Sequence, residues 1–371
     1  MRVVIFARVS IKLNPYIILF KETLEGQGLS VNLEREFNLK WLLSNGRFCD
    51  CIHLHWINSI YQPFQRKYSS NLTKRFMESR YIRAFRSLFH LINVTIALFL
   101  TRLQGKIIVY TVHDLDWFGL NIGFYSMLRR IAHHVVIKLS HHIHVHNHYS
   151  RMFIETRYKR KDGVAVISHG NYIGVYPNNT SKHDARRHLG LEMDDFVYLF
   201  FGTLRPYKGL EDLLDAFSKL KMSSARLLIA GPVLGGPAYK TMLEELSMNN
   251  SAIKLVPEFV SDDNVQLYMN ASDICVLPYK HITTSGAAAL ALSYGRPIIA
   301  PAITCFPELI TSEMGILYDP SDQNALALAL LQASAQSWSE SKIIDYAHQF
   351  DWYKLGPQLA GLYGKQARKK R

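Results

Sequence analysis

The sequence contains few residues of the kinds that build disulfide-linked, fibrous or disordered chains. Of its 371 residues only four are cysteines, at positions 49, 51, 275 and 305, and they form neither a CxxC pair nor the spacing of a zinc site. Glycine (21) and proline (13) are too sparse for a collagen-like or low-complexity chain. With 48% hydrophobic residues the chain can bury one large core or two ordinary ones, and its few cysteines suggest a reducing, cytoplasmic compartment.

Long apolar runs are also missing. The opening residues, MRVVIFARVSIKLNPY, have too short an apolar stretch for a secretory signal, so we expect none. The uncharged run at residues 87–101 contains His90 and Asn93 and is shorter than the roughly 20 residues that span a bilayer.

Acidic residues are scarce in the first half of the chain. Residues 1–175 contain 24 Lys and Arg against 10 Asp and Glu, whereas residues 176–371 contain 19 against 20. The whole positive excess therefore lies in the first half, which indicates two domains with different partners. A basic half could face nucleic acid, a phosphate-bearing substrate or an anionic membrane surface.

The basic excess is densest around the uncharged run. Between Trp56 and His113 the only acidic residue is Glu78, while aromatic and aliphatic residues alternate with arginines. Two interpretations stay open: a long core helix with a solvated basic flank, or an interfacial helix that docks on a membrane. Nucleic acid is the weakest option, because no basic-aromatic recognition module appears.

Short apolar runs alternate with helical patterns along the chain, which predicts parallel α/β units. Strands are predicted at residues 3–7, 51–55, 106–112, 142–146 and 163–168, and again at 197–201, 225–229, 253–255, 274–277 and 297–300. The polar stretch YPNNTSKH at 176–183 is the best linker. We therefore expect two Rossmann-like, doubly wound domains with a ligand cleft at the carboxyl ends of strands, between the domains.

Two loops of the second domain have the composition of an anion cradle. The loop after 197–201 runs from Gly202 to Gly209, and its Arg205 and Lys208 offer a guanidinium fork and a point charge for a diphosphate. The loop after 274–277 contains Tyr279 and Lys280 and leads into a helix start in which Ser285 or Thr284 is the cap, followed by Gly286. An ordinary solvated turn remains an alternative for the first loop, and a further turn at Glu258 could hold a nucleobase.

These segments carry a resemblance to a known family. The succession FGTLRPYKGLEDLLDAF, LIAGP, ASDICVLPYKHITTSGAAALALSYGRPIIAP and CFPELI resembles the donor-binding half of nucleotide-sugar glycosyltransferases of the two-Rossmann (GT-B) type. The N-terminal segments NPY at 14–16, HLHW at 53–56, TVHD at 111–114 and HGNY at 169–172 agree, and together the segments are most similar to bacterial β-mannosyltransferases of exopolysaccharide assembly. That family implies GDP-mannose as donor and a polyprenyl-diphosphate-linked saccharide as acceptor, with no further cofactor.

The resemblance also implies roles for particular residues. Donor contacts fall on Gly202, Arg205, Lys208, Glu258, Tyr279, Lys280, Thr284, Ser285, Gly286 and, as a sugar or ribose contact, Glu308. Acceptor contacts fall on Asn14, Tyr16, His55, Trp56, His169 and Tyr172. The implied domains are 1–175 together with a returning C-terminal helix at 345–371, and 176–344.

One departure from larger retaining relatives bears on the mechanism. The two positions at which those enzymes have glutamates fall on Ile282 and Leu290 here. The missing carboxylate suggests an inverting enzyme, in which a base deprotonates the acceptor hydroxyl while fixed cations stabilise the departing diphosphate, so no metal is required. We expect Asp114 or Asp116 as the base and His113 as an orienting or donor contact, although His113 could be purely structural.

Two further segments invite a functional interpretation. His144, His146 and His148 are predicted on one face of a strand, but they lack the carboxylate or cysteine partners of common metal sites, so we expect no metal there. The basic tail at 365–371 would strengthen attachment to anionic lipid, or it is simply solvated. Together these observations predict an enzyme attached peripherally to the cytoplasmic face of the membrane.

Overall fold

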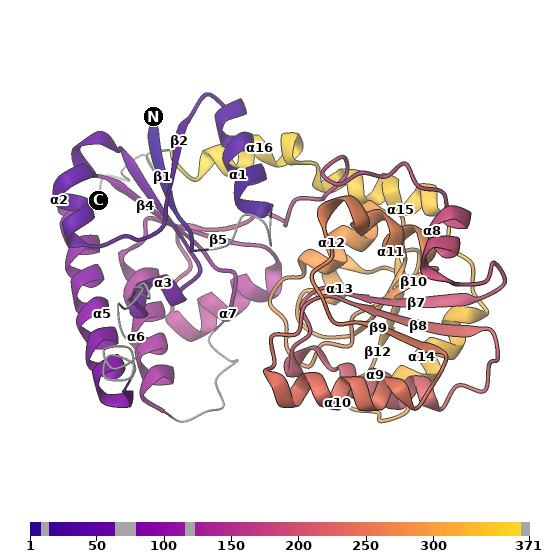
Figure 1. Ribbon diagram of the computed structural model, residues 1–371. Coiled ribbons are helices and arrows are strands. Elements are labelled where there is room, and N and C mark those ends of the chain that lie inside the picture. Colours follow the sequence, from indigo (N-terminus) through magenta and orange to yellow (C-terminus); the bar gives the residue numbers. More distant parts are fainter. Residues whose placement is uncertain (9–14, 64–78, 116–122, 365–371) are drawn as a thin grey trace. The chain divides into compact units, whose positions relative to one another are not determined.

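The computed structural model describes residues 1–8, 15–63, 79–115 and 123–364 (Figure 1). They form two compact units, the first made of Met1–Ser168 with the C-terminal segment from Trp352, and the second of His169–Asp351. The division thus falls before residue 169 rather than at the expected boundary of 175, and the C-terminal return begins at Trp352 rather than at 345. Asn171 explains the earlier boundary, because its backbone N–H donates to Phe350 O and its side chain donates to Asp351 Oδ1, both within the second unit.

The first unit is built on a parallel sheet with the strand order β2-β1-β3-β4-β5-β6. Its strands are β1 (Arg2–Phe6), β2 (Ser30–Glu34), β3 (Cys51–His55), β4 (Ile107–Thr111), β5 (His142–Val145) and β6 (Val164–Val166). Its helices are α1 (Tyr16–Gly26), α2 (Leu39–Asn45), α3 (Asn58–Tyr61), α5 (Arg80–Leu103), α6 (Phe124–Leu139), α7 (His148–Tyr158) and α16 (Trp352–Gly361), with a 3-10 turn η2 (Gly46–Phe48).

Helices cover both faces of this sheet because alternate residues of its strands point to opposite sides. On one face Val4, Ile52 and Ile108 pack into a core with α2, α5 and α6. On the other face Val3 and Ile5 pack with α1 and with α16, which lie together although they come from opposite ends of the chain (Figure 1). The first unit therefore depends on the C-terminal helix for its second core.

The second unit repeats this plan with the strand order β12-β11-β10-β7-β8-β9. Its strands are β7 (Phe196–Phe201), β8 (Ala225–Ala230), β9 (Ile253–Val256), β10 (Ile274–Val276), β11 (Ile298–Pro301) and β12 (Gly315–Tyr318). Its helices are α8 (Lys182–Leu189), α9 (Leu210–Ser218), α10 (Pro237–Met248), α11 (Val265–Ala271), α12 (Gly286–Ser293), α13 (Phe306–Leu309), α14 (Ala325–Ser334) and α15 (Glu340–Ala347), with 3-10 turns η4 (Pro206–Lys208), η5 (Asp262–Asn264) and η6 (His348–Phe350).

Two parallel, doubly wound sheets confirm the predicted α/β class. The ten predicted strands occur within one or two residues of their expected ends, whereas β2 and β12 were not predicted. Both are edge strands, and the partly exposed pattern of β2 lacks the continuous apolar run of a central parallel strand. The helix predicted around residues 87–101 is longer than expected, extending over Arg80–Leu103.

Candidate functional site

The strand order of the second sheet reverses between β7 and β10. These two strands are neighbours, β8 and β9 continue on the β7 side, and β11 and β12 continue on the β10 side. Ligands of open parallel sheets bind outside the carboxyl ends of the strands at this switch point. The loops at residues 202–209 and 278–285, the two predicted cradles, follow β7 and β10 at this place.

The two loops are packed directly against each other. The Lys280 N–H donates to Tyr207 O at 2.9 Å, and a Cβ added at Gly209 would lie 2.0 Å from Pro278 O. Gly209 also has a φ of 69°, a conformation that favours glycine. The sequence therefore needs glycine here for the loops to meet.

Lys208 provides a buried cation at this junction. Its side chain is 8% exposed, and its Nζ lies 5.0 Å from the centre of the Tyr279 ring and 5.8 Å from that of Phe200. Burial, and to a smaller extent the charge of Arg205, lower the pKa of Lys208 to about 8. A Cβ at Gly202 would lie 3.4 Å from this Nζ, so the missing side chain leaves the ammonium open toward the loop backbone. An anion bound there would favour the charged lysine.

The other two cations of the cradle differ in availability. Arg205 is exposed and makes no ion pair with the described residues. Lys280 lies 3.2 Å from Asp212 Oδ2, so its charge is partly neutralised. Arg205 and Lys208 are therefore the stronger candidates for contacting a diphosphate.

Helix α12 adds a third source of positive potential. Of the two predicted caps it is Ser285 that caps the helix, because its side chain accepts a hydrogen bond from Ala288 N at 3.1 Å; Thr284 precedes it, half-buried. Gly286 opens the first turn, where backbone N–H groups have no partner within the helix and attract anions.

His169 and Tyr172 lie beside this helix start rather than in the first unit, where the sequence placed them. A Cβ at Gly286 would lie 3.4 Å from the Tyr172 hydroxyl and 3.9 Å from His169 Nε2. The Tyr172 N–H donates to Ser293 Oγ at 2.9 Å, which fixes the segment to α12. These two predicted acceptor contacts therefore belong to the unit that contains the predicted donor cradle.

The remaining predicted donor residues follow strands outside the β7–β10 pair. Glu258 is exposed after the edge strand β9, and Glu308 is exposed in the short helix α13 after β11. Ile282 and Leu290, the positions of the missing carboxylates, are apolar parts of the fold: Ile282 O accepts from Thr304 Oγ1, and Leu290 is buried in α12.

The first sheet has its own switch point, between β1 and β3. Tyr16 opens α1 after β1, His55 ends β3, and Trp56 follows with a left-handed φ of 53°. The indole of Trp56 stacks on the His113 ring with centroids 4.2 Å apart, and the Tyr16 ring meets the same imidazole edge-on at 5.2 Å. The structure thus brings three predicted acceptor residues around the predicted His113.

His113 is also held by a second imidazole. His113 Nε2 and His55 Nδ1 are 2.9 Å apart, while His55 Nε2 is buried without a hydrogen-bond partner among the described residues. Burial, and then the charges of His53, His144 and His146, lower the pKa of His55 well below its usual value. Because another proton in this cluster is costly, the half-buried Asp114 next to His113 is better suited to accept one. Asp116 and Asn14 lie outside the described residues.

A buried polar chain below these residues was not predicted. Ile167 O can only accept, so with neutral rings His144 Nε2 donates to it, and Thr111 in turn donates to His144 Nδ1. Thr111 Oγ1 then accepts from His53 Nε2, and the Tyr363 hydroxyl donates to His53 Nδ1 at 2.6 Å. Polar residues inside the apolar strands CIHLH, IIVYT and HIHV are the signal that could have revealed it.

Of the three alternating histidines, His144 belongs to this buried hydrogen-bonded chain. The prediction that His144, His146 and His148 share one strand is wrong, since β5 ends at Val145 and His148 begins α7 behind its cap Asn147. Within the described ranges no group of three His, Cys, Asp or Glu side chains could hold a metal ion.

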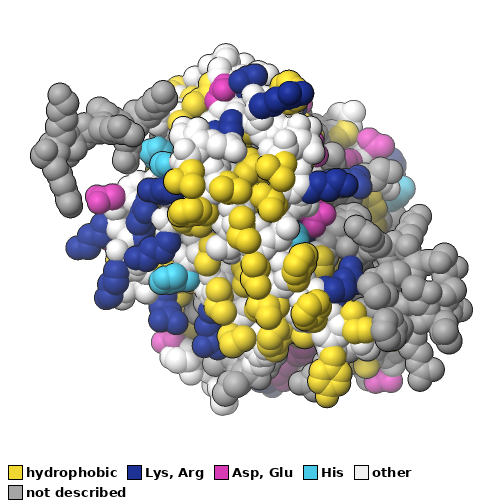
Figure 2. Space-filling view, turned by 90° about the vertical axis from the view of Figure 1, so that its left-hand side faces the viewer, with side chains coloured by type: hydrophobic (Ala, Val, Ile, Leu, Met, Phe, Trp, Pro, Cys, Tyr) yellow, Lys and Arg dark blue, Asp and Glu magenta, His cyan; other side chains and the backbone are white. Residues whose placement is uncertain are grey.

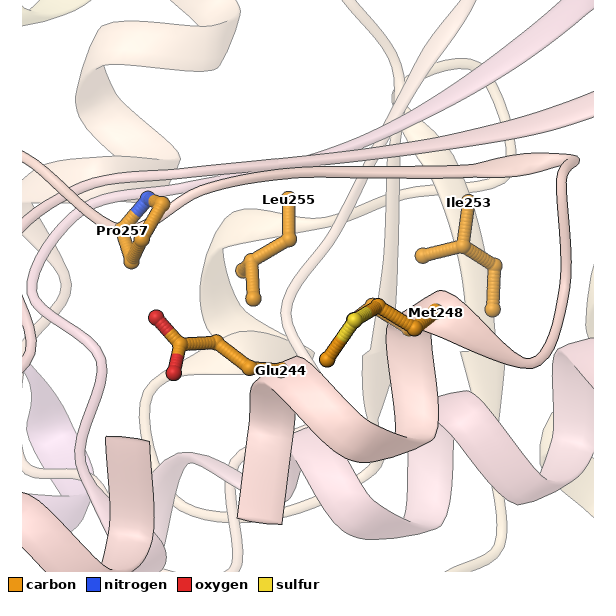
Figure 3. Close-up of a pocket in the computed structure, with 6 residues that line it drawn as sticks. Glu244, Met248, Ile253, Leu255 and Pro257 are labelled. Atoms are coloured by element: carbon orange, nitrogen blue, oxygen red, sulfur yellow. The ribbon is translucent and has the colours of Figure 1, made fainter. Parts of the chain in front are cut away.

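A separate hollow of about 380 Å³ lies between α10 and the edge strand β9. Figure 3 shows Glu244 and Met248 of α10 opposite Ile253, Leu255 and Pro257. Its lining is mostly apolar and includes none of the predicted donor residues, so we do not assign the cradle to it.

Comparison with known proteins agrees with this geometry. Residues 195–336 match the family of glycosyl transferases group 1. A D-inositol 3-phosphate glycosyltransferase of Corynebacterium efficiens is 26% identical over 219 residues, covering 55% of this chain and 51% of that protein. A GDP-mannose:glycolipid 4-beta-D-mannosyltransferase of Xanthomonas campestris pv. campestris is 35% identical over 103 residues, covering 28% of this chain and 29% of that protein. The chain thus spans about half the length of the first relative and less of the second.

Solved structures extend the likeness over both units. Sucrose-phosphate synthase from Thermosynechococcus elongatus superposes with a TM-score of 0.73 at 17% identity, covering 98% of each chain. Anabaena HepE in complex with UDP-glucose has a TM-score of 0.70 at 17% identity, covering 97% of this chain and 98% of HepE. The predicted resemblance to GT-B glycosyltransferases and the predicted GT-B fold are confirmed.

Proposed function

We propose that this chain, whose residues 195–336 match the glycosyl transferases group 1, transfers a hexose from a nucleoside-diphosphate sugar to a glycan acceptor. The observation that carries the proposal is the cradle at the β7–β10 switch point, where Lys208, Arg205 and the start of α12 provide positive potential beside glycine backbone. Such a site fits a diphosphate and stabilises it as a leaving group without a metal ion.

For the donor we propose GDP-mannose, and for the acceptor a polyprenyl-diphosphate-linked saccharide used in exopolysaccharide assembly. The support is the resemblance described above and the mannosyltransferase of Xanthomonas campestris, whose name states GDP-mannose and a glycolipid. A UDP-sugar donor of the gluco- or glucuronosyl type is the second candidate, favoured by the fold shared with HepE, which was solved with UDP-glucose. The acceptor would be met at the cytoplasmic face of an anionic membrane.

The proposed chemistry is a single displacement with inversion. The acceptor oxygen forms a bond to the anomeric carbon while the bond from that carbon to the diphosphate oxygen breaks. The acceptor proton passes to Asp114 or to Asp116, and His113, held by His55 and Trp56, orients the acceptor. The negative charge that develops on the diphosphate is met by Arg205 and Lys208.

Thermal-shift titration with GDP, UDP, ADP and TDP, with and without EDTA, tests the proposal. Stabilisation by GDP that survives EDTA and is lost in Arg205→Ala supports a metal-independent mannosyl donor site. Arg187→Ala is the matched control, because Arg187 is exposed on α8 and pairs with Asp184 away from the cradle. Selectivity for UDP would indicate a UDP-linked, glucose-type donor sugar. No shift with any nucleotide would refute the proposed transferase activity in favour of a catalytically inactive scaffold.

A further inference from the structure

Helix α5 has two apolar faces, of which only one is used by the core. Leu91, Val94, Ala97 and Leu98 are buried against the first sheet and its helices. The opposite face exposes large apolar side chains at steps of three or four residues, with Tyr81 at 84%, Phe85 at 70% and Phe89 at 63% exposure. The complete stripe is Tyr81, Phe85, Leu88, Phe89, Ile92, Ile96, Phe99 and Leu103.

Helix α6 widens this stripe into a surface. The two helices are in contact, and α6 exposes Phe124, Met127 and Ile131. We call the stripe together with these three residues the α5–α6 apolar face. Figure 2 shows apolar side chains gathered on this side of the molecule, with Lys and Arg side chains along their borders. Contiguous apolar surface of this kind marks an interaction site.

The charges on the two helices have one sign. Neither Arg80–Leu103 nor Phe124–Leu139 contains an Asp or Glu, while both helices contain arginines. Besides Arg80, the basic residues of the two helices are Arg83, Arg86, Arg102, Arg129, Arg130 and Lys138. Long basic side chains beside an apolar stripe can reach phosphate groups while their stems stay on apolar surface.

We propose that the α5–α6 apolar face lies in the interface of an anionic membrane, with α5 parallel to the bilayer surface. Tyr81–Leu103 is long and apolar enough to cross a membrane, but crossing would expose the core residues on its other face. A second copy of this chain fits poorly, because it would bring the basic residues of both copies together. Anionic headgroups match these charges, and exposed aromatic rings favour the interfacial region.

This inference rests on the proposed function in one respect, since a lipid-linked acceptor would be presented at such a surface. Its physical basis is independent, because the face belongs to the first unit and the nucleotide cradle to the second. The two can therefore fail separately, and the experiment below measures both.

The test is flotation of the full chain with vesicles of phosphatidylcholine alone and with phosphatidylglycerol added. We expect binding to the anionic vesicles, reduced at least about tenfold in the double variant Phe85→Glu/Phe89→Glu. Arg83→Gln/Arg86→Gln should reduce it by about fivefold per charge removed. The matched control is Leu328→Glu/Leu331→Glu on α14, whose side chains are about as exposed but lie in the second unit.

Each variant is also melted with and without the nucleotide that stabilises the wild type. A cooperative melt and an unchanged far-UV circular dichroism spectrum of Phe85→Glu/Phe89→Glu show that its first unit is folded, so its loss of vesicle binding belongs to the surface, whereas the nucleotide shift reports only on the second unit. The inference is overturned if the wild type does not float with anionic vesicles, or if this variant floats as well as the wild type. A wild-type dimer that the variant dissociates, without vesicle binding, would assign the face to self-association instead.

Discussion

Replacing Lys208 by methionine should stabilise the protein while weakening nucleotide binding. Burial lowers the pKa of Lys208 to about 8 in the folded chain, against a usual value near 10.5. At pH 7 the lysine is charged in both states, so the folded state carries a desolvation cost that corresponds to roughly 3 kcal/mol. Lys208→Met removes this cost and keeps an apolar stem beside Tyr279.

The sign of the pH dependence follows from the same shift. Between about pH 8 and 10.5 the unfolded chain binds more protons at this site than the folded chain, so the wild type gains stability as the pH rises. The advantage of Lys208→Met should therefore be largest at pH 7 and should disappear above about pH 10.5. The affinity of Lys208→Met for nucleotide should fall although its stability rises, because a lost charge-assisted contact to a diphosphate costs about tenfold or more in affinity.

Urea unfolding at several pH values and thermal-shift titration with a nucleoside diphosphate measure the two effects. Lys280→Met is the control, since that lysine is about half exposed and pairs with Asp212, so its loss should change stability by less than about 1 kcal/mol. A Lys208→Met protein that is less stable than the wild type at pH 7, or that binds nucleotide equally well, would refute the reasoning.

Three further changes test other parts of the structure. Burial lowers the pKa values of His53 and His55 well below 6.5, so both take up protons only on unfolding. Their contribution to the free energy of unfolding should be fully present above about pH 6.5. At lower pH the free energy of unfolding should decrease by up to about 1.4 kcal/mol per pH unit for each histidine, so equal urea midpoints at pH 7.5 and 5.5 would contradict this. Gly209→Ala should destabilise the second unit and abolish the nucleotide shift because its Cβ meets Pro278 O, whereas Gly190→Ala, with a similar φ of 65° and nothing within 4 Å, should cost only about 1 kcal/mol in urea unfolding. Ser285→Ala should cost about 1 kcal/mol through the lost cap of α12 and weaken nucleotide binding, and Ser285→Thr should retain both properties in the same assays.

The central strands could be predicted because parallel strands buried on both faces have continuous apolar runs. Every residue of β3 and β4 is buried, and both were predicted from the sequence. The edge strand β2 alternates between exposed and buried residues and was missed. The two loops at the β7–β10 switch point could also be predicted, since parallel strands place their following loops at one edge of the sheet.

Other features of the site depend on contacts between distant residues. The ion pair of Lys280 with Asp212 joins the loop after β10 to the first turn of α9, which is far away in the sequence, and no local pattern marks it. The association of Tyr172 with α12 depends on Ser293, so the sequence placed this residue in the wrong unit. The left-handed turn at Trp56 is likewise set by its packing on His113, because tryptophan has no intrinsic preference for that conformation.

The two switch points of this chain have different chemistry although their strand topology is similar. In the second unit a buried ammonium, an exposed guanidinium and a helix start surround glycine backbone, which is an environment for a multiply charged anion. In the first unit an indole, a phenol and imidazoles line the corresponding place, with a carboxylate next to them. Aromatic faces and ring nitrogens suit a sugar, whose ring has apolar faces and hydroxyl groups that need hydrogen bonds. This difference supports the proposed division between a donor diphosphate held by the second unit and an acceptor saccharide held by the first.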